Sequence, residues 1–166
     1  MPISPYISEL RASIGTRRLL LPSVSAHIFD SSRRLLLVKH RESGVWSTPG
    51  GSMEPDERPA DAVVREVWEE TGLLVVPRQL AGVFGGPECV VRYVNGDEAQ
   101  YVVIAFECEI TGGTLQSDGD ETVEARYVSE AEATGLSLSS WLPPALATVY
   151  GRDRSFLDAK WSPGQT

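Results

Sequence analysis

The segment from Gly51 to Leu73 constrains the fold of this chain more than any other part of the sequence. A helix is expected over Pro59–Thr71, because proline is favoured in a first helical turn and Gly72 stands where a helix often ends in a left-handed residue. At about 100° per residue, the apolar side chains of this helix share one face, which we expect to pack on a core. These side chains are Ala60, Val63, Val64 and Val67.

Three glutamates lie along another edge of the same predicted helix. Glu66, Glu69 and Glu70 fall within an arc of about 100°, well away from the apolar face. Like charges three and four positions apart destabilise a helix by about 0.2–0.5 kcal/mol per pair, and their crowding raises the pKa of at least one carboxyl group. A bound cation would remove this conflict. Mg²⁺ is the expected ion, with Mn²⁺ as a substitute, since it prefers hard oxygen ligands and completes its shell with water and substrate phosphate.

The charge of the whole chain restricts its partners. Asp and Glu number 23 against 15 Lys and Arg, which gives a net charge of −8. This charge opposes attraction to a nucleic-acid backbone, and the chain has no apolar stretch of the roughly 18–20 residues that a membrane helix needs. An acidic protein binds a small polyanion when divalent cations on its carboxylates reverse the local field. We therefore expect a small-molecule substrate, and neither a nucleic-acid polymer nor a membrane as partner.

The ends of the chain and its cysteines predict a cytoplasmic location. A secretory signal is not expected at the N-terminus, because Glu9 falls where such a signal should be apolar and Arg17 comes late. Cys89 and Cys108 are too few for a disulfide scaffold, and we expect both to be buried thiols.

One mixed α/β domain is the expected organisation, because 166 residues suit a single core. We expect an N-terminal helical extension over residues 1–20, the main domain over residues 21–150, and a C-terminal tail over residues 151–166. Within the extension, the helical spacing of apolar residues predicts a helix over Pro5–Ile14, which ends at Gly15. Such a helix packs either on the core or on a second subunit, and it favours a homodimer over a monomer.

Two hairpins are indicated by local turn residues. Val24–Phe29 and Arg34–Lys39 are β-rich runs separated by a polar turn. Val90–Val94 and Tyr101–Phe106 flank the dipeptide Asn95-Gly96, a strong hairpin signal. Further strands are expected at Leu73–Val76, Leu80–Phe84 and Ala125–Val128, and further helices near Glu130–Gly135 and Ala145–Tyr150.

The spacing of residues between Gly51 and Leu73 resembles the signature of the Nudix hydrolases, Gly-x5-Glu-x7-Arg-Glu-U-x-Glu-Glu-x-Gly-U, in which U is aliphatic. Every specified position is filled, and a chance match has a probability on the order of 10⁻⁶ if residues are independent. The resemblance implies an α/β/α sandwich with a mixed β-sheet, in which the segment forms a loop, a helix and a loop. The matching residues are Gly51, Glu57, Arg65, Glu66, Val67, Glu69, Glu70, Gly72 and Leu73.

This resemblance also implies roles for single residues. The three helix glutamates would bind the metal directly or through water, and a backbone carbonyl before the helix would supply another oxygen. Arg65 and Glu57 look like the family's orienting salt bridge, which fixes where the ligand carboxylates point. The implied metal ligands are therefore Gly50, Glu66, Glu69 and Glu70.

The general base is less narrowly indicated. Several Nudix enzymes take it from a loop glutamate shortly before a strand that carries an aromatic residue. Glu121, which precedes Tyr127, matches this arrangement and is the first choice. Glu66 and Glu69 are the alternatives within the helix, and Glu98 in a hairpin turn is a weaker one.

The reaction implied by the resemblance is Mg²⁺-dependent hydrolysis of a nucleoside diphosphate linked to another group, in which a metal-activated water cleaves the pyrophosphate bond. A proline at a set distance beyond the motif marks some ADP-ribose hydrolases. Pro87 lies close to that distance and slightly favours ADP-ribose or a related nucleotide. Hydrolysis of a nucleoside triphosphate or a dinucleoside polyphosphate is the alternative within the enzyme class. A non-catalytic nucleotide-sensing module is the alternative outside it, although such a sensor would not need all the carboxylates.

Overall fold

The computed structural model describes residues 4–151 of the chain. Within that range, no helix is both long enough and apolar enough to cross a membrane. The elements in chain order are α1 (Pro5–Ile14), β1 (Leu19–His27), β2 (Leu35–His40), β3 (Trp46–Ser47), α2 (Pro59–Thr71), β4 (Leu73–Phe84), η1 (Pro87–Cys89), β5 (Val90–Arg92), β6 (Glu98–Gly113), β7 (Thr122–Val128), α3 (Glu130–Ala133) and α4 (Leu142–Tyr150).

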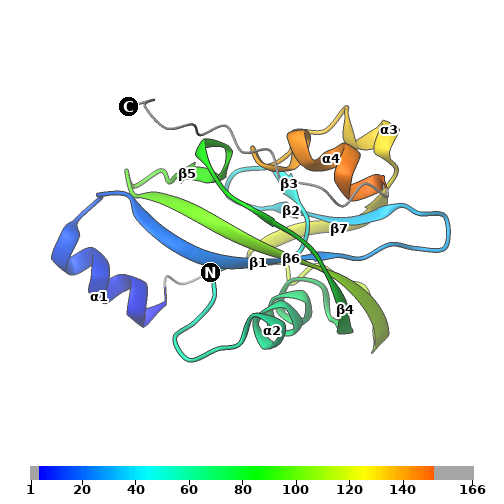
Figure 1. The fold of residues 1–166 in the computed structure, drawn as a ribbon, viewed down its shortest axis with the longest axis horizontal. Coiled ribbons are helices and arrows are strands. Elements are labelled where there is room, and N and C mark those ends of the chain that lie inside the picture. Colours follow the sequence, from blue (N-terminus) through cyan, green and yellow to red (C-terminus); the bar gives the residue numbers. More distant parts are fainter. Residues whose placement is uncertain (1–3, 152–166) are drawn as a thin grey trace, which may run out of the picture.

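The strands form two sheets between layers of helices. The first sheet has the order β1-β6-β4, with β5 also paired to β6, and the second has the order β3-β2-β7. β1 runs parallel to β6, whereas the other pairs are antiparallel. α2 lies on one side of the first sheet, and α3 and α4 lie on the other (Figure 1). The predicted α/β/α sandwich with a mixed β-sheet is therefore confirmed.

The helix α2 has the predicted bounds, and its ends show why. Pro59 occupies its first turn, and Gly72 ends it in the left-handed conformation with φ 66°. A Cβ on Gly72 would lie 2.9 Å from the carbonyl oxygen of Thr114, so both the backbone angle and the close approach require glycine.

The face that α2 turns to the core differs in part from the predicted one. Val63 and Val67 are fully buried against β1, and Val64 packs at the edge of the same cluster. Ala60, however, is exposed, and Ala62 is buried in its place. The helix is rotated toward its carboxylate edge, because a loop that covers that edge supplies part of its packing surface.

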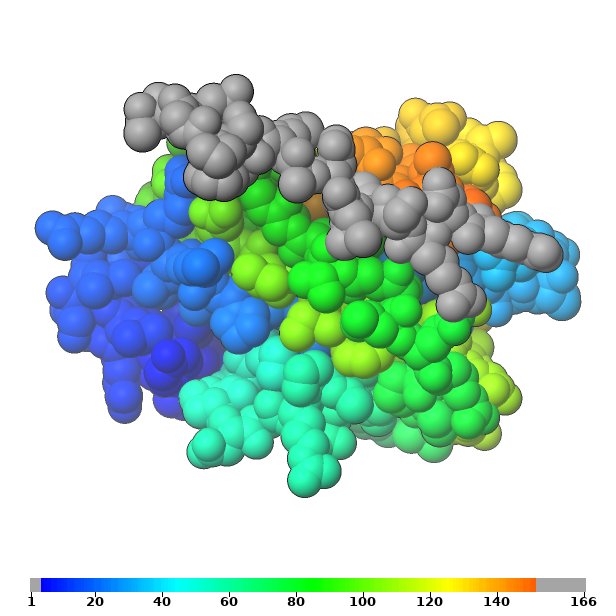
Figure 2. Space-filling model, in the orientation of Figure 1, coloured from blue at the N-terminus to red at the C-terminus, as the bar shows by residue number. Residues whose placement is uncertain are grey.

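The helix α1 forms one end of the molecule, in blue in Figure 2. None of its residues is buried, although Ile7, Leu10 and Ile14 are half-buried on one face, and α1 is not part of either core cluster. Instead, Arg11 Nη2 donates to the carbonyl of Glu98 at 2.7 Å, and Arg11 Nε lies 3.5 Å from the carboxylate of Asp97. A homodimer and the three-part division of the chain stay predictions, and the proposed tail lies outside the described residues except for Gly151.

One of the two predicted hairpins is formed, and the other is formed only beside its turn. β5 and β6 pair around the Asn95-Gly96 turn, with Arg92 opposite Glu98. β1 and β2, in contrast, lie in different sheets. Beside the turn, Phe29 and Leu35 form an antiparallel bridge and Leu36 N–H donates to the carbonyl of Ile28 at 2.8 Å. The predicted hairpin is therefore confined to the residues next to the polar turn and does not extend along the strands, because β1 pairs along its length with the distant β6.

Two predicted strands are one continuous strand, β4, which passes through Pro77. Proline is tolerated there because β4 is at the edge of its sheet and the register shifts between Pro77 and Gln79. Cys89 and Cys108 are free buried thiols, as predicted.

Candidate active site

The loop between β3 and α2 crosses the carboxylate edge of the helix. Its carbonyl oxygens pair with β1, since Gly51 accepts from Val24 at 2.9 Å and Pro49 accepts from Ala26 at 2.8 Å. The fit to α2 is too close for a side chain, because a Cβ on Gly51 would lie 2.6 Å from Glu66 Oε1. A Cβ on Gly50 would clash with the backbone of Val24. These two glycines therefore bring a main-chain loop into direct contact with the helix glutamates.

Glu70 is held under this loop. Its side chain accepts a hydrogen bond of 2.9 Å from the backbone N–H of Gly50, and the residue is 3% exposed. Burial raises the pKa of Glu70 well above its usual value, although the Gly50 N–H partly opposes this shift. The nearby charges of Glu66 and Glu121 raise the pKa further. Glu70 is thus a buried carboxyl group beside two others, and its charge is poorly compensated.

Glu66 is buried even more completely, with 0% exposure. Its Oε1 accepts from Arg65 Nη1 at 2.8 Å, whereas its Oε2 is buried without a hydrogen-bond partner. Burial raises the pKa of Glu66 to about 7, Arg65 opposes the rise, and Glu69 and Glu121 add to it. A buried oxygen without a partner is unusual and calls for an explanation, such as an ion.

Arg65 is shared by several carboxylates. Its Nε and Nη2 bind the two oxygens of Glu57 at 2.8 and 2.9 Å, and its Nη1 also reaches Glu69 at 3.1 Å. The carbonyl of Ser52 accepts from Nη2 at 3.2 Å, which ties the guanidinium to the loop. Hydrogen bonds from Arg65 lower the pKa of Glu57, and they raise the pKa of Arg65 itself. The bidentate geometry is what an orienting salt bridge requires.

The predicted metal ligands are neighbours, but their side chains do not converge on one point. Glu66 and Glu69 share Arg65, the side chain of Glu69 is 49% exposed, and Glu70 instead bonds to Gly50. Within residues 4–151, no group of three or more His, Cys, Asp or Glu side chains is arranged to hold a metal ion. The physical reason is that the carboxylates repel one another, so those within reach of Arg65 turn to the one adjacent positive charge.

Glu121 comes close to this cluster from a turn that precedes β7. Asp118 orders the turn by accepting backbone N–H bonds from Asp120, Glu121 and Thr122. The hydroxyl of Thr122 donates to the carbonyl of Glu70 at 3.1 Å, which fixes the turn to the end of α2. Burial is the main cause of the raised pKa values of Glu66 and Glu70, and the charge of Glu121 adds to both.

Three residues that hold this turn were not found by sequence reasoning. Asp118 and Thr122 lie four residues apart, the spacing of a local side-chain turn, which was the only available signal. Arg41 donates through its side chain to the carbonyl of Asp120 at 2.9 Å and to that of Gly119, contacts that no local pattern indicates.

Glu98, the weaker candidate for the base, lies in a different environment. It pairs with Arg18 at 3.0 Å and with Arg92 at 2.7 Å, and hydrogen bonding to Arg18 lowers its pKa. A carboxylate held between two guanidinium groups is a weak proton acceptor. The structure therefore does not bring Glu98 together with the α2 glutamates.

The carboxylate edge of α2 fits a divalent cation. Its donors are hard oxygens, one of them the unpartnered Oε2 of Glu66, and two of the carboxyl groups are buried with too little positive charge around them. Glycine at position 51 lets the backbone of the loop pack directly against the carboxylate of Glu66. A cation at this edge would compensate the charge that Arg65 leaves uncompensated.

Comparisons with known proteins identify the family of the chain. The family model described as the NUDIX domain matches residues 19–150. An ADP-ribose pyrophosphatase of Methanocaldococcus jannaschii is 32% identical over 67% of this chain and 64% of that protein. A MutT-like protein of Streptomyces ambofaciens is 33% identical over 60% of this chain and 58% of its own length. The chain thus matches less than two thirds of either relative.

A similar solved structure is that of an ADP-ribose pyrophosphatase from Streptococcus suis. It superposes with a TM-score of 0.61 and 27% identity, and the match covers 82% of this chain and 93% of that one. The NUDIX model spans most of the residues between α1 and the end of α4, including every position of the motif. The chain therefore belongs to the Nudix hydrolase family.

Proposed function

We propose that this protein hydrolyses the diphosphate bond of a nucleoside diphosphate linked to another group, and that it depends on Mg²⁺. The observation that carries the proposal is the pair of buried carboxyl groups, Glu66 and Glu70, under a loop that only glycine permits. Burying carboxylates without matching positive charge costs stability, so such an arrangement is typical of a functional site. The family assignment supports hydrolysis as that function.

The proposed ligands of the metal are the side chains of three glutamates and one backbone carbonyl. When bound, Mg²⁺ would screen the charge of the diphosphate, polarise its phosphorus–oxygen bonds and lower the pKa of a coordinated water. Because Arg65 contacts Glu66 and Glu69, the metal would share these two carboxylates with the guanidinium. The ligands are Gly50, Glu66, Glu69 and Glu70.

Glu57 and Arg65 act as positioning residues in this proposal. Glu57 holds the guanidinium by two hydrogen bonds, and the guanidinium in turn limits where Glu66 and Glu69 can point. Ser52 adds a third contact from the loop. Residues that orient metal ligands in this way typically change affinity or activity by about 10–100-fold when replaced.

Glu121 is the proposed general base. It lies on the ordered turn beside Glu66 and Glu70, and its charge acts on the carboxyl groups of both. Its carboxylate would take the proton from the water whose oxygen bonds to phosphorus, while the bond from that phosphorus to the bridging oxygen breaks and the other phosphate leaves. Glu66 and Glu69 are less suited to this role, because both are bonded to Arg65.

A cavity at the start of β1 is a suitable place for the rest of the substrate. It has a volume of about 510 Å³, and Arg18, Arg92 and Pro87 line it. β1 leads from this cavity to Val24, which is bonded to Gly51. Pro87 thus lies at a cavity, and the two ADP-ribose pyrophosphatases among the similar proteins favour ADP-ribose or a related nucleotide as the substrate.

A substrate panel tests this proposal. The kcat/KM of the protein with Mg²⁺ should be highest for ADP-ribose or another nucleoside diphosphate derivative, with release of a nucleoside monophosphate. A higher kcat/KM for nucleoside triphosphates or dinucleoside polyphosphates would assign one of those classes instead. Saturable nucleotide binding without turnover of any of these compounds, with Mg²⁺ or Mn²⁺, would contradict hydrolysis and support a sensing module.

A further inference from the structure

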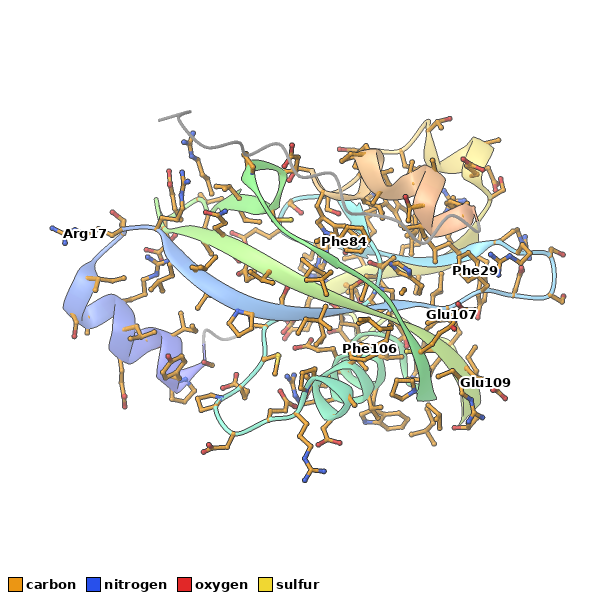
Figure 3. The ribbon with its side chains drawn as sticks, viewed as in Figure 1. Arg17, Phe29, Phe84, Phe106, Glu107 and Glu109 are labelled. Atoms are coloured by element: carbon orange, nitrogen blue, oxygen red, sulfur yellow. The ribbon has the colours of Figure 1, made fainter. Side chains whose placement is uncertain are left out.

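A second cavity lies away from the carboxylates of α2. It has a volume of about 300 Å³ and is bounded by the ends of β1 and α4 and by the middle of β4. Figure 3 labels three of its lining residues, Phe29, Phe84 and Glu107, which come from segments far apart in the sequence. Phe84 belongs to the core cluster under α4, on the side of the sheet opposite α2. The size is at the lower end of the range for small-molecule sites, which is about 300–1,000 Å³.

A buried histidine without a hydrogen-bond partner lines this cavity. His27 is 3% exposed, and its Nε2 has no hydrogen-bond partner. Burial lowers the pKa of His27 to about 4, so the ring is neutral near pH 7 and Nε2 either donates or accepts one hydrogen bond. Because buried polar atoms are nearly always paired, this atom indicates a ligand in the cavity.

The residues beside His27 form a polar row across the sheet. In the strand register His27 lies next to Glu107 on β6, and Glu107 lies next to Gln79 on β4. Gln79 Nε2 donates to Glu107 Oε2 at 2.5 Å, which holds the carboxylate in place beside the cavity. The row therefore presents a fixed acceptor, an amide and an imidazole nitrogen along one edge.

Aromatic and cationic planes complete the walls. Phe29 and Phe84 are aromatic, and the guanidinium carbon of Arg33 lies 4.2 Å from the centroid of the Phe29 ring. The walls are more polar than apolar, and the two aromatic rings among them favour a flat ligand, since stacked rings gain more than the burial of their area alone. Glu107 disfavours an anion although Arg33 also lines the cavity, and a metal ion is disfavoured because His27 and Glu107 are the only metal-ligating side chains (His, Cys, Asp or Glu) among the described residues that line it.

We propose that this cavity binds a neutral, planar heteroaromatic molecule the size of a purine base. A ring nitrogen of the ligand would bond to His27 Nε2, and an exocyclic amino group would donate to Glu107. Such a ligand uses the polar edge and the aromatic walls at once, which neither an aliphatic molecule nor a simple ion does. The site is separate from the hydrolytic one, because it lies on the opposite side of the first sheet from α2.

Adenine is a suitable probe, because it carries the required groups and has no phosphate to bind a metal. The chain has two histidines, His27 and His40, so the imidazole nitrogens of ¹⁵N-histidine-labelled protein give two sets of NMR signals. Adenine should shift the His27 signals saturably and leave those of His40 unchanged. The His27→Phe variant assigns the signals. No shift of His27 at the solubility limit of adenine would overturn the proposal and leave water as the only occupant.

Variants at the rim of the cavity provide the controls. Thr148→Trp should fill the cavity from α4 and weaken adenine binding at least tenfold, whereas Ser13→Trp on the exposed face of α1 should bind adenine as the wild type does. If Thr148→Trp fails to fold, Glu107→Gln replaces it as the test, and this variant should also bind adenine at least tenfold more weakly. Undiminished binding in either cavity variant would overturn the proposal.

The Glu70→Gln variant separates this site from the hydrolytic one. It should lose hydrolysis and keep adenine binding, and adenine should not compete with the nucleotide substrate of the wild type. Loss of adenine binding in Glu70→Gln, or competition with the substrate, would show that the cavity belongs to the hydrolytic site and would contradict the proposal.

Discussion

Two groups of arginines and glutamates in this molecule have opposite balances of charge. At β5 and β6 a single carboxylate, Glu98, meets two guanidinium groups, from Arg18 and Arg92. At α2 a single guanidinium, Arg65, meets three carboxylates, and Glu70 lies buried nearby. The first group is largely open to solvent, whereas the second contains two buried carboxyl groups.

The pKa values show what this difference means. The arginines lower the pKa of Glu98, so they stabilise its charged form and no further cation is needed. Burial raises the pKa of Glu66 to about 7, and one shared guanidinium is not enough to reverse the rise. An exposed ion pair is thus complete in itself, whereas the α2 group lacks positive charge and is suited to binding a cation.

The largest effect is expected from Glu70→Gln. The amide oxygen can still accept from Gly50 N–H, so the fold should persist, but a charged metal ligand is lost. Metal stabilisation of the transition state is worth several kcal/mol, so kcat should fall by about 10³–10⁴-fold. Steady-state kinetics and the Tm of the variant check this result together. Unchanged activity in a folded variant would show that Glu70 is not a metal ligand needed for hydrolysis.

Glu121→Gln should have the next largest effect. General bases typically contribute about 10²–10⁴-fold, and a fall in kcat of about 10²–10³-fold is expected if Glu121 takes the proton from water. Binding of Mg²⁺ should persist, because Glu121 is not a proposed ligand. The rise in Tm caused by Mg²⁺ should therefore match that of the wild type. A kcat equal to that of the wild type would show that Glu121 is not the general base and would leave Glu66 or Glu69 in that role.

Arg65→Lys should reduce kcat/KM by about 10–100-fold, the range for residues that orient metal ligands. A lysine keeps the charge but cannot bind Glu57 through two nitrogens while also reaching Glu66 and Glu69. Arg78→Lys is the matched control, because it alters an exposed arginine–glutamate pair on β4 and β6 in the same way and should leave kcat/KM unchanged. Equal kinetics for Arg65→Lys and wild type would show that geometry at α2 does not depend on this guanidinium.

Glu98→Gln should have the smallest effect. Its ion pairs are exposed, and such pairs contribute little to stability. We expect a small decrease in Tm and the wild-type response of Tm to Mg²⁺. A loss of the Mg²⁺ response in this variant would show that Glu98 also contributes to cation binding, so that the two groups do not differ in the way described.

Local signals in the sequence predicted the elements that depend on local chemistry. Pro59 and Gly72 define α2, and the Asn95-Gly96 turn defines the β5–β6 hairpin. The pairing of β1 with β6 was not predictable in this way, because a polar turn shows where the chain reverses and not which strand it will join. The continuity of β4 through Pro77 likewise depends on its place at a sheet edge, which is a property of the whole fold.

The candidate site was predictable by residue type and only partly by arrangement. The helical spacing placed Glu66, Glu69 and Glu70 on one edge of α2, but it gave no sign that two are buried and one is exposed. That difference arises because the loop carrying Gly51 lies over part of the edge. Arg41 could not be found from the sequence, since it reaches the Glu121 turn from a distant loop.

A crystal structure with Mg²⁺ and a non-cleavable substrate analogue would show whether a cation binds at the carboxylate edge of α2. We expect an ion at about 2.0–2.1 Å from carboxylate oxygens of Glu66 and Glu70, with phosphate oxygens and water completing its shell. Glu66 Oε2 would then have the partner that it lacks. A bound analogue with no ion at these carboxylates, and with Glu66 still paired only to Arg65, would contradict the proposed metal site.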